Sequence, residues 1–213
     1  MFEIMEQRLY TAVCCDVMDD LGYRNQAMHH NIRPLDDNVK VIGRAKTILA
    51  VDVYEVTKDC YKVEIEALDS VKEGEVVVVS TNNSLTNGIW GELLSTAAKA
   101  RGARGAIIDG LGRDIEKIRE MKFPVFMVGF KPVDSKGRGL VIDYDCPINC
   151  GGVIVEPGDI VFGDYDGVIA IPHRICHEVI ERSLHKVEKE QSTKNALLKG
   201  KLLKDVYDQF GVL

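Results

Sequence analysis

The spacing of hydrophobic and polar residues predicts one helix followed by β structure in the first part of the chain. Between Thr11 and Leu21 the apolar residues recur at helical intervals, and Gly22 offers a stop directly afterwards. Two later segments, 39–53 and 76–79, are rich in β-branched residues, which favour strands. We therefore expect an early helix and then two strands.

The centre of the chain alternates between strands and helices. The expected elements, in order, are a strand at 76–79, a helix at about 92–100, a strand at 106–109, a loop at 110–112, a helix at about 114–121 and a strand at 123–128. Strands that alternate with helices indicate a layered α/β fold with parallel strand pairing. No stretch resembles a linker, so we interpret residues 1–213 as a single domain.

The last third changes character. Three short β segments with glycine turns are predicted at 151–155, 159–162 and 167–172. A charged helix follows over 177–195, or about 174–196 with its flanks. Such a helix either caps its own domain or packs on a neighbouring subunit, and we expect the neighbouring subunit.

Composition narrows the class of protein. Hydrophobic residues make up 46% and charged residues 28%, which excludes an intrinsically disordered chain. The net charge of −6 argues against a general nucleic-acid binder, which needs a basic surface. The longest run without charge, 76–91, is too short and too polar to span a bilayer.

The N-terminus and the cysteines predict a cytoplasmic protein. The first residues carry acid where a signal peptide would carry base. The six cysteines form no CxxC pair, and we expect all of them to be reduced thiols. Cys146 and Cys150 flank Pro147, which is a weak signal for a metal site.

Two loops carry the candidate chemistry, because both follow strands at the edge where α/β folds place ligands. In the first, Gly88 and Gly91 let the backbone approach a ligand closely. The helix that begins near Glu92 directs its unpaired amides toward this loop, which suits a carboxylate or a phosphate. The alternative is that Glu92 only complements the helix dipole while Trp90 packs in the core.

The second loop runs from Asp109 to Asp114. Its Arg113 can donate two hydrogen bonds to a carboxylate or an enolate oxygen. Its Asp114 offers a hard oxygen ligand that suits Mg²⁺ or Mn²⁺. The alternative is an N-cap aspartate paired with a nearby arginine. Neither loop has the glycine spacing of a nucleoside-triphosphate or a dinucleotide site.

Together the two loops resemble the RraA-like family. The sequence Gly91-Glu92-Leu93-Leu94 is followed after 18 residues by Arg113-Asp114. Further similar segments cover nearly the whole chain, among them 43–45, 124–126, 147–153, 157–159 and 164–168. The enzymatic members of this family are class II 4-hydroxy-4-methyl-2-oxoglutarate and 4-carboxy-4-hydroxy-2-oxoadipate aldolases. The resemblance implies a layered fold of the swivelling β/β/α type, assembled as a homotrimer or a hexamer with active sites between subunits.

The resemblance also implies roles for particular residues. The amides of residues 91–94 (Gly91, Glu92, Leu93 and Leu94) would hold the pyruvate carboxylate, Arg113 would contact the substrate, and Asp114 would bind the divalent cation. Glu92 would hold a water on that cation. A glutamate from the C-terminal helix of the neighbouring subunit would complete the water shell; Glu190 matches best and Glu188 is second.

The implied chemistry is consistent with the residues. Breaking a carbon–carbon bond next to a 2-oxo acid leaves an enolate, which a divalent cation and Arg113 would stabilise. Cleavage of a 4-hydroxy-2-oxo acid to pyruvate is the predicted reaction, and oxaloacetate decarboxylation needs the same stabilisation. The substrate beyond pyruvate stays open; His29 and His30 either reach that region or are simply exposed.

A non-catalytic role is the alternative. The namesake members of the family inhibit an RNA-degrading endonuclease by protein contact, and the acidic surface permits such binding. The presence of Glu92, Arg113 and Asp114 together favours the aldolase.

Overall fold

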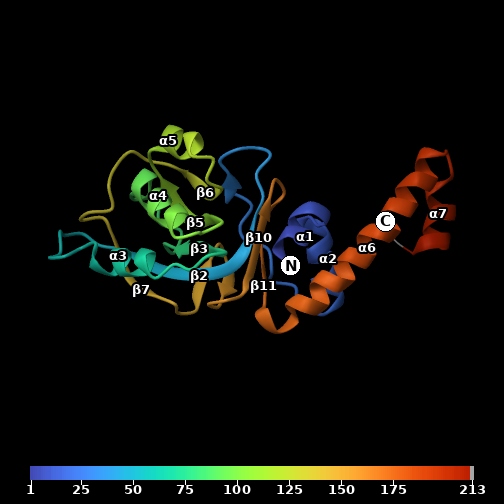
Figure 1. Cartoon of the computed structure of the whole chain (residues 1–213), viewed down its shortest axis with the longest axis horizontal. Helices are drawn as coiled ribbons and strands as arrows, with labels where there is room; N and C mark the ends of the chain where they lie inside the picture. The colour runs from blue at the N-terminus through green and yellow to red at the C-terminus, as the bar shows by residue number, and fades with distance from the viewer. Residues whose placement is uncertain (212–213) are drawn as a thin grey trace.

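Eleven strands and seven α-helices make up residues 1–211, the part of the chain that the computed structural model describes (Figure 1). The helices are α1 (Phe2–Arg8), α2 (Thr11–Asp20), α3 (Lys62–Asp69), α4 (Glu92–Ala100), α5 (Ile115–Glu120), the short 3₁₀ helix η1 (His173–Ile175), α6 (Cys176–Leu198) and α7 (Leu203–Phe210). The strands are β1 (Arg33–Pro34), β2 (Val41–Asp52), β3 (Glu75–Ser80), β4 (Gly88–Trp90), β5 (Gly105–Gly112), β6 (Val125–Phe130), β7 (Gly139–Tyr144), β8 (Ile148–Cys150), β9 (Val153–Val155), β10 (Ile160–Asp164) and β11 (Gly167–Ile171).

One sheet of nine strands organises the molecule. Its order is β1-β6-β5-β3-β2-β10-β11, with β4 beside β5 and β7 beside β2. The pairs β2–β3, β3–β5 and β5–β6 are parallel, as the alternation of strands and helices predicts. A bridge between Ala27 and Ile169, with a hydrogen bond from Arg33 to the Tyr165 carbonyl, links the two edges. The sheet therefore curls into a nearly closed, barrel-like layer.

Strand β3 shows why the centre of this sheet is stable. Its four valines are all buried, and they alternate between the two faces of the sheet. Val77 and Val79 pack against the layer of helices α3, α4 and α5, whereas Val76 and Val78 face the interior of the curved sheet. A central parallel strand with both faces covered requires such an unbroken apolar run.

The long strand β2 joins the two halves of the molecule. Its first residues pair with β10, where Val41 lies opposite Gly163. Its last residues pair with β7, where Asp52 lies opposite Gly139. Because β3 pairs along the middle of the same strand, β2 fixes the position of the helical layer relative to β10 and β11.

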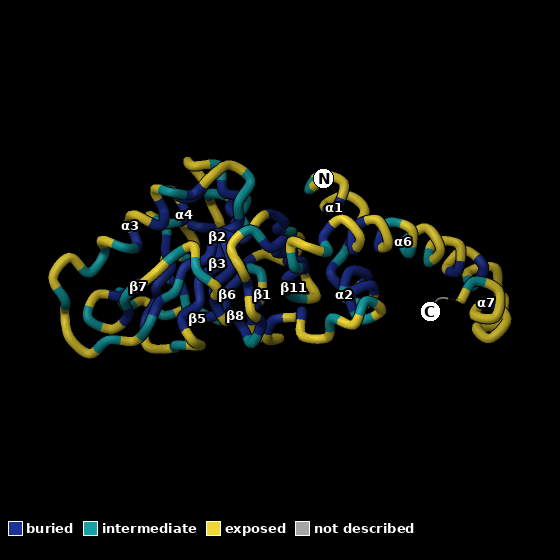
Figure 2. The backbone as a smooth tube through the Cα atoms, turned by 90° about the horizontal axis from the view of Figure 1, so that it is seen from below, coloured by how far each residue is buried: buried dark blue, intermediate teal, exposed yellow. Residues whose placement is uncertain are grey.

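Three apolar clusters form the core, as the buried segments in Figure 2 show. The first lies between the sheet and helices α3 to α5 and includes Leu68, Trp90, Ala98 and Ile118. The second fills the inside of the curved sheet and includes Ile32, Ile107, Phe126 and Val161. The third joins α1, α2 and α6 to β10 and β11 and includes Met5, Val13, Phe162 and Val179.

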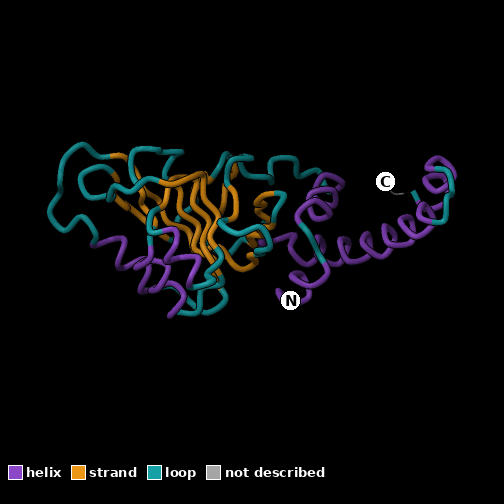
Figure 3. Tube along the Cα trace, turned by 90° about the horizontal axis from the view of Figure 1, so that it is seen from above, coloured by secondary structure: helices purple, strands orange, loops and turns teal. Residues whose placement is uncertain are grey.

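Helix α6 extends beyond the rest of the molecule. Its first half packs against α2, and its second half projects outward to α7, as Figures 1 and 3 show. Leu198 at the end of α6 is exposed, and so are Leu202, Leu203 and Tyr207 in and directly before α7. Across residues 1–211, no helix combines the length and the apolar character needed to cross a bilayer.

The observed elements confirm most of the predicted ones. The helix over 92–100 has the predicted bounds, and the early helix, the central strands and the C-terminal helix begin and end within a few residues of them. The prediction of a loop at 110–112 is wrong, because β5 continues through these residues to pair with β4 and β6. The register of both pairings shifts there, and glycine is required: a Cβ at Gly110 would lie 2.7 Å from the Thr81 hydroxyl oxygen.

The buried carboxylate of Asp109 holds this region together. It accepts hydrogen bonds from the Thr81 hydroxyl at 2.8 Å and from the Gly151 amide at 3.4 Å, and also from the Thr81 amide. These bonds connect β5 to the end of β3 and to the turn between β8 and β9. Asp109 is therefore a structural residue and not a ligand-binding one.

We expect Asp109→Ala to lower the free energy of unfolding by about 3 kcal/mol, because buried donors lose their acceptor. Urea denaturation measures this change. Asp69→Ala, which removes an exposed aspartate, is the control and should leave the midpoint unchanged. Equal midpoints for both variants would contradict the structural role of Asp109.

Candidate active site

The two loops singled out in the sequence meet at one place. Strand β4 pairs with the end of β5, so that Trp90 lies opposite Gly112. The Arg113 amide donates a hydrogen bond of 2.8 Å to the Trp90 carbonyl. The Glu92 amide then donates to a carboxylate oxygen of Asp114 at 3.3 Å. A short parallel pairing thus brings the start of helix α4 against the start of helix α5.

The contact between the starts of α4 and α5 requires glycine at position 91. A Cβ at Gly91 would lie 2.7 Å from Asp114 Oδ2 and 3.2 Å from Arg113 Cγ. Gly88 is equally constrained, since its Cβ would lie 2.5 Å from the Lys131 carbonyl oxygen. The glycines therefore serve close approach between two protein segments, in addition to any approach of a ligand.

Asp114 has an unusual backbone conformation. Its φ of 59° and ψ of 35° lie in the left-handed region, which aspartate tolerates better than most residues. It occupies the N-cap position of α5, yet its side chain makes no capping hydrogen bond to that helix. The carboxylate is turned toward α4 instead, and such local strain is typical of functional positions.

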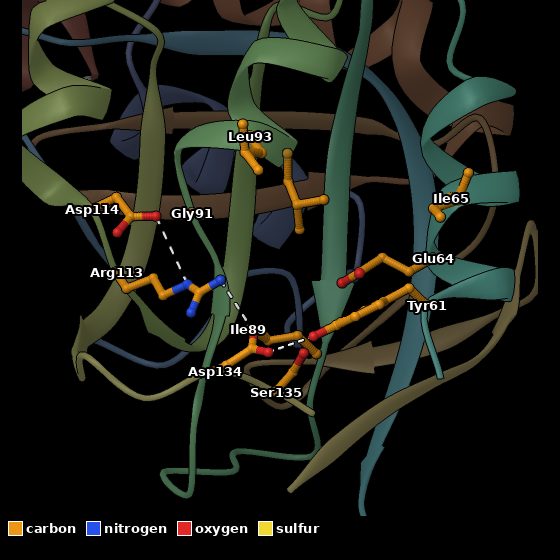
Figure 4. A pocket seen from close by; sticks show the side chains of 11 residues that line it. Tyr61, Glu64, Ile65, Ile89, Gly91, Leu93, Arg113, Asp114, Asp134 and Ser135 are labelled. Carbon is orange, nitrogen blue, oxygen red and sulfur yellow. Dashed lines mark hydrogen bonds and ion pairs between the residues drawn. The ribbon is translucent and has the colours of Figure 1, made fainter. Parts of the chain in front are cut away.

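Arg113 is held by two carboxylates. Its guanidinium lies 3.1 Å from Asp134 Oδ1, and its Nε lies 3.8 Å from Asp114 Oδ2. The Tyr61 hydroxyl donates a short hydrogen bond to Asp134. Figure 4 shows this chain of contacts from Tyr61 through Asp134 to Arg113. The orientation of Arg113 therefore depends on residues that lie far from it in the sequence.

The pKa values around Asp134 reflect these contacts. Partial burial raises the pKa of Asp134, but the hydrogen bond from Tyr61, the charge of Arg113 and backbone hydrogen bonds from Ser135 and Lys136 together outweigh burial and hold this pKa below its ordinary value. The same hydrogen bond, with smaller contributions from burial and the Asp134 charge, raises the pKa of Tyr61 to about 12. Tyr61 is consequently protonated and Asp134 charged at neutral pH.

Glu64 is the most unusual titratable group of the site. It lies on helix α3 and is only 8% exposed. Burial, followed by repulsion from Asp134, raises its pKa to about 7, while attraction by Arg113 acts in the opposite direction. Its carboxyl group is therefore partly protonated near neutral pH.

These side chains surround a cavity of about 330 Å³. The residues that line it are Tyr61, Glu64, Ile65, Ile89, Gly91, Leu93, Leu94, Arg113, Asp114, Asp134 and Ser135. In Figure 4 the Glu64 carboxyl group points into this space from the side opposite Arg113. The cavity has the size of a small-molecule site and contains both charged and apolar groups.

Most of the residues predicted from sequence lie here. Gly91, Leu93, Leu94, Arg113 and Asp114 all line the cavity. Leu93 is 79% exposed, so it lies at the rim.

Glu92 lies in the predicted turn, but only its backbone amide has a contact with the other loop. Its amide is engaged by Asp114, and its side chain is not among the groups that line the cavity. Trp90 is buried, and its indole nitrogen donates to the Ser95 hydroxyl at 2.8 Å, so the alternative in which Trp90 packs in the core is correct for this residue.

Glu190 and Glu188 lie outside this cavity, on helix α6. Glu190 accepts a short hydrogen bond from Tyr10, and Glu188 pairs with Arg8 at 2.9 Å. Figure 1 places α6 on the opposite side of β10 and β11 from helices α4 and α5. Within a single chain, therefore, neither glutamate reaches the site.

Three functional candidates were missed by the sequence analysis, namely Tyr61, Glu64 and Asp134. Asp134 follows β6, and the rule that ligands bind beyond the carboxyl ends of parallel strands could have indicated it. Tyr61 and Glu64 carry no such signal, because α3 was not expected. His29 and His30 are exposed and do not line the cavity.

Asp114 is the donor that best fits a hard cation. Its carboxylate is 43% exposed and faces the cavity, with one oxygen directed at the Glu92 amide. Within residues 1–211, no group of three or more His, Cys, Asp or Glu side chains could enclose a metal ion. Asp114 is therefore the carboxylate that could hold a hard cation here, with small oxygen ligands as its other partners.

Comparison with known proteins identifies the family. The profile described as RraA-like, Aldolase/RraA, matches residues 11–170. The protein MJ0644 of Methanocaldococcus jannaschii is 35% identical over 83% of this chain and 83% of its own length. The chain therefore belongs to the RraA-like family.

Two further relatives differ in length and name. A protein of Halalkalibacterium halodurans, provisionally named a 4-hydroxy-4-methyl-2-oxoglutarate aldolase, is 31% identical over 78% of this chain and 76% of its own. DlpA of Legionella pneumophila is 29% identical over 94% of this chain, which spans only 32% of DlpA.

Solved structures confirm the fold. RraAS2 of Streptomyces coelicolor, described as an unusual member of the RNase ES inhibitor RraA protein family, superposes with a TM-score of 0.80 at 27% identity, covering 88% of this chain and 92% of its own. A structure described among novel cellulases from gut-associated microbes gives a TM-score of 0.84 at 34% identity, over 88% of this chain and 83% of its own. The layered RraA-like fold predicted from the sequence is thereby confirmed.

We expect Glu64→Gln to remove a pH-dependent loss of stability. Because the pKa of Glu64 is about 7 in the folded protein and 4.5 ordinarily, the wild-type protein loses stability as the pH rises from about 4.5 to about 7. The variant should match the wild type near pH 4 and exceed it by up to about 3 kcal/mol near pH 8.

Urea denaturation across this pH range measures the difference. Glu66→Gln, on the exposed face of the same helix, is the matched control and should follow the wild type at every pH. Parallel curves for Glu64→Gln and the wild type would show that Glu64 has an ordinary pKa.

Proposed function

We propose that this protein is a divalent-metal-dependent class II aldolase that cleaves a 4-hydroxy-2-oxo acid to pyruvate. The observation that carries this proposal is the contact between the turn at Gly91–Leu94 and the Arg113–Asp114 pair, at the edge of a cavity. On one side of this cavity, the first amides of helix α4 and Arg113 could bind a 2-oxo acid. The opposite side leaves space for the rest of the substrate. The provisional aldolase names of relatives support the same reading.

Mg²⁺ or Mn²⁺ is the proposed cofactor, and Asp114 is the residue that would hold it. When bound, the cation would supply Lewis-acid stabilisation of negative charge on the 2-oxo acid. The exposed carboxylate of Asp114 suits this role because the remaining partners of a hard cation are small oxygen ligands.

The proposed reaction is a retro-aldol cleavage. The bond between C3 and C4 breaks, the 4-hydroxyl group loses its proton and becomes a carbonyl group, and the electron pair passes to C3. The resulting pyruvate enolate takes up one proton at C3. Arg113 would stand beside the developing negative charge, and its fixed orientation through Asp134 would lower the cost of reorganisation. Oxaloacetate decarboxylation, which forms the same enolate, is the proposed side activity.

The first turn of α4 would bind the substrate carboxylate. The amides of Glu92, Leu93 and Leu94 are not used within the helix, and the helix dipole favours an anion there. The Glu92 amide is engaged by Asp114 in this structure, which leaves Leu93 and Leu94 as the donors nearest the cavity.

The C-terminal helix would complete the site from a neighbouring subunit. Helices α6 and α7 project from the sheet and together expose Leu198, Leu202, Leu203 and Tyr207, which suits packing on another copy in a homotrimer or a hexamer. Glu190 would then reach the neighbouring cavity, with Glu188 as the second candidate. Glu190 would have to release its hydrogen bond with Tyr10 to do so.

A binding role without catalysis is the second candidate. It is favoured by the similarity to RraAS2, which is described within an RNase ES inhibitor family.

We expect the purified protein to release pyruvate from 4-hydroxy-4-methyl-2-oxoglutarate or oxaloacetate only when Mg²⁺ or Mn²⁺ is present. A coupled lactate dehydrogenase assay measures the release. Asp114→Asn keeps the backbone conformation but weakens the cation ligand, and Arg113→Lys loses the forked geometry. Each variant should therefore lower kcat/KM by at least about 100-fold.

Glu116→Gln, an exposed substitution on α5, is the control and should keep the wild-type rate. A metal-independent rate, or near-normal rates in either site variant, would contradict the assignment. If every substrate failed with and without metal, the binding role would remain.

We expect active sites shared between subunits to be rescued by mixing. Asp114→Asn and Glu190→Gln should each be nearly inactive as pure proteins. Unfolding and refolding them together in equal amounts should restore about a quarter of the wild-type activity, because about one site in four then receives both native residues. A mixture as inactive as its components would rule out the contribution of Glu190 from a neighbouring chain.

A further inference from the structure

The cavity of one chain has few positive charges for an acidic substrate. It is lined by three carboxyl groups, Glu64, Asp114 and Asp134, and by one cation, Arg113, which lies close to two of them. The proposed substrate 4-hydroxy-4-methyl-2-oxoglutarate has two carboxylates, and its 2-oxo acid end would engage Arg113 and the divalent cation. The second carboxylate needs a further cation, which the cavity-lining residues within 1–211 do not supply.

The outer part of the C-terminal arm carries the complementary charge. Residues 191–211, which follow the contact of Glu190 with Tyr10, contain four lysines and two aspartates. In the part of the chain that the structure describes, the ion pairs of α6 all lie before residue 190, so Lys194 is exposed and unpaired. The arm is therefore basic where the cavity is acidic.

Helical periodicity places Lys194 beside Glu190. Residues four apart share one face of a helix and are separated by about 6 Å along its axis. Glu190, Lys194 and Leu198 therefore form one line along α6, with the exposed leucine last. A neighbouring cavity that receives Glu190, as proposed above, receives Lys194 one turn farther out.

Apolar groups at the mouth of the cavity match the end of this line. Leu93 and Ile65 line the cavity and are 79% and 55% exposed, and Leu198 is 77% exposed. Burial of such groups against each other is favourable. Because α6 lies on the opposite side of β10 and β11 from α4 and α5, as Figure 1 shows, this contact forms only between two copies.

We propose that the outer end of α6 from a second copy covers the mouth of the cavity, and that its Lys194 binds the second carboxylate of a dicarboxylic substrate. This inference rests on the proposed function and names the residue that selects the substrate. Lys194 is a specificity-determining residue in this arrangement, because it contacts the carboxylate at C5 and leaves the 2-oxo acid end to the other chain.

The test compares two substrates that differ only at C5. 4-Hydroxy-4-methyl-2-oxoglutarate has a carboxylate there, and 4-hydroxy-4-methyl-2-oxopentanoate has a methyl group. Lys194→Met removes the cation and keeps most of the length of the side chain. With Mg²⁺ present, it should lower kcat/KM for the dicarboxylic acid at least about tenfold and change that for the monocarboxylic acid less than about twofold.

Lys189→Met is the matched control. Lys189 is also exposed and unpaired within residues 1–211, but it directly precedes Glu190 and so lies on a different face of α6. This variant should keep both rates. An equal loss in the two variants would overturn the inference, because general attraction by the arm would then explain it. A loss in Lys136→Met, which alters the neighbouring hollow, in place of Lys194→Met would also overturn it.

Mixing shows whether Lys194 acts from a second copy. Asp114→Asn and Lys194→Met, unfolded and refolded together in equal amounts, should recover about a quarter of the wild-type rate with the dicarboxylic acid, because about one site in four receives both native residues. If Lys194 acted within its own chain, the refolded mixture would stay at the average of its two components, which would refute the contact between copies.

Binding separates this inference from the proposed cleavage. 2-Oxoglutarate and 2-oxopentanoate lack the 4-hydroxyl group and are not cleaved, and calorimetric titration with Mg²⁺ present measures their affinities. Lys194→Met should weaken binding of 2-oxoglutarate at least about tenfold and that of 2-oxopentanoate less than about twofold. This result without pyruvate release from any substrate would refute the aldolase and keep the role of Lys194. Unchanged binding of 2-oxoglutarate would refute that role even in an active aldolase, and binding of neither acid by the wild-type protein would refute both.

Discussion

The hydrogen bond between the Glu92 amide and the Asp114 carboxylate is the contact on which the arrangement of the site depends. It joins the starts of two helices that follow different strands, and it exists because β4 pairs with the end of β5. Gly91 permits it by leaving no side chain between the two segments. The pairing of the β4 and β5 backbones thus positions the site, and the contacts between charged side chains follow from that pairing.

A second layer of contacts sets the electrostatic character of the cavity. Arg113 is oriented by Asp134, and Asp134 is kept charged by Tyr61. Glu64 has no comparable partner and responds to burial by holding its proton more tightly. The cavity therefore combines an oriented ion pair on one side with a carboxyl group of raised pKa on the other.

The sequence predicted the central fold well because the signals there are local. The valines of 76–79 and the helix over 92–100 depend on residues adjacent in the chain, and both are observed. Helix α3 was missed because Lys62-Val63-Glu64-Ile65-Glu66 alternates polar and apolar residues, a pattern typical of a strand. The burial of Glu64 comes from the packing of α3 against α4 and β7, which no local pattern contains. Strand β5 was ended too early because glycines that permit close packing resemble those that form a turn.

At Asp114 the fold requires a residue that accepts a left-handed backbone conformation, whereas the proposed chemistry requires a negatively charged side chain. Asparagine accepts the same conformation and nearly the same shape, but it carries no charge. One substitution, Asp114→Asn, could therefore silence the proposed catalysis while the backbone and the core stayed intact. The fold at this position therefore places no demand on the charge that the proposed chemistry needs.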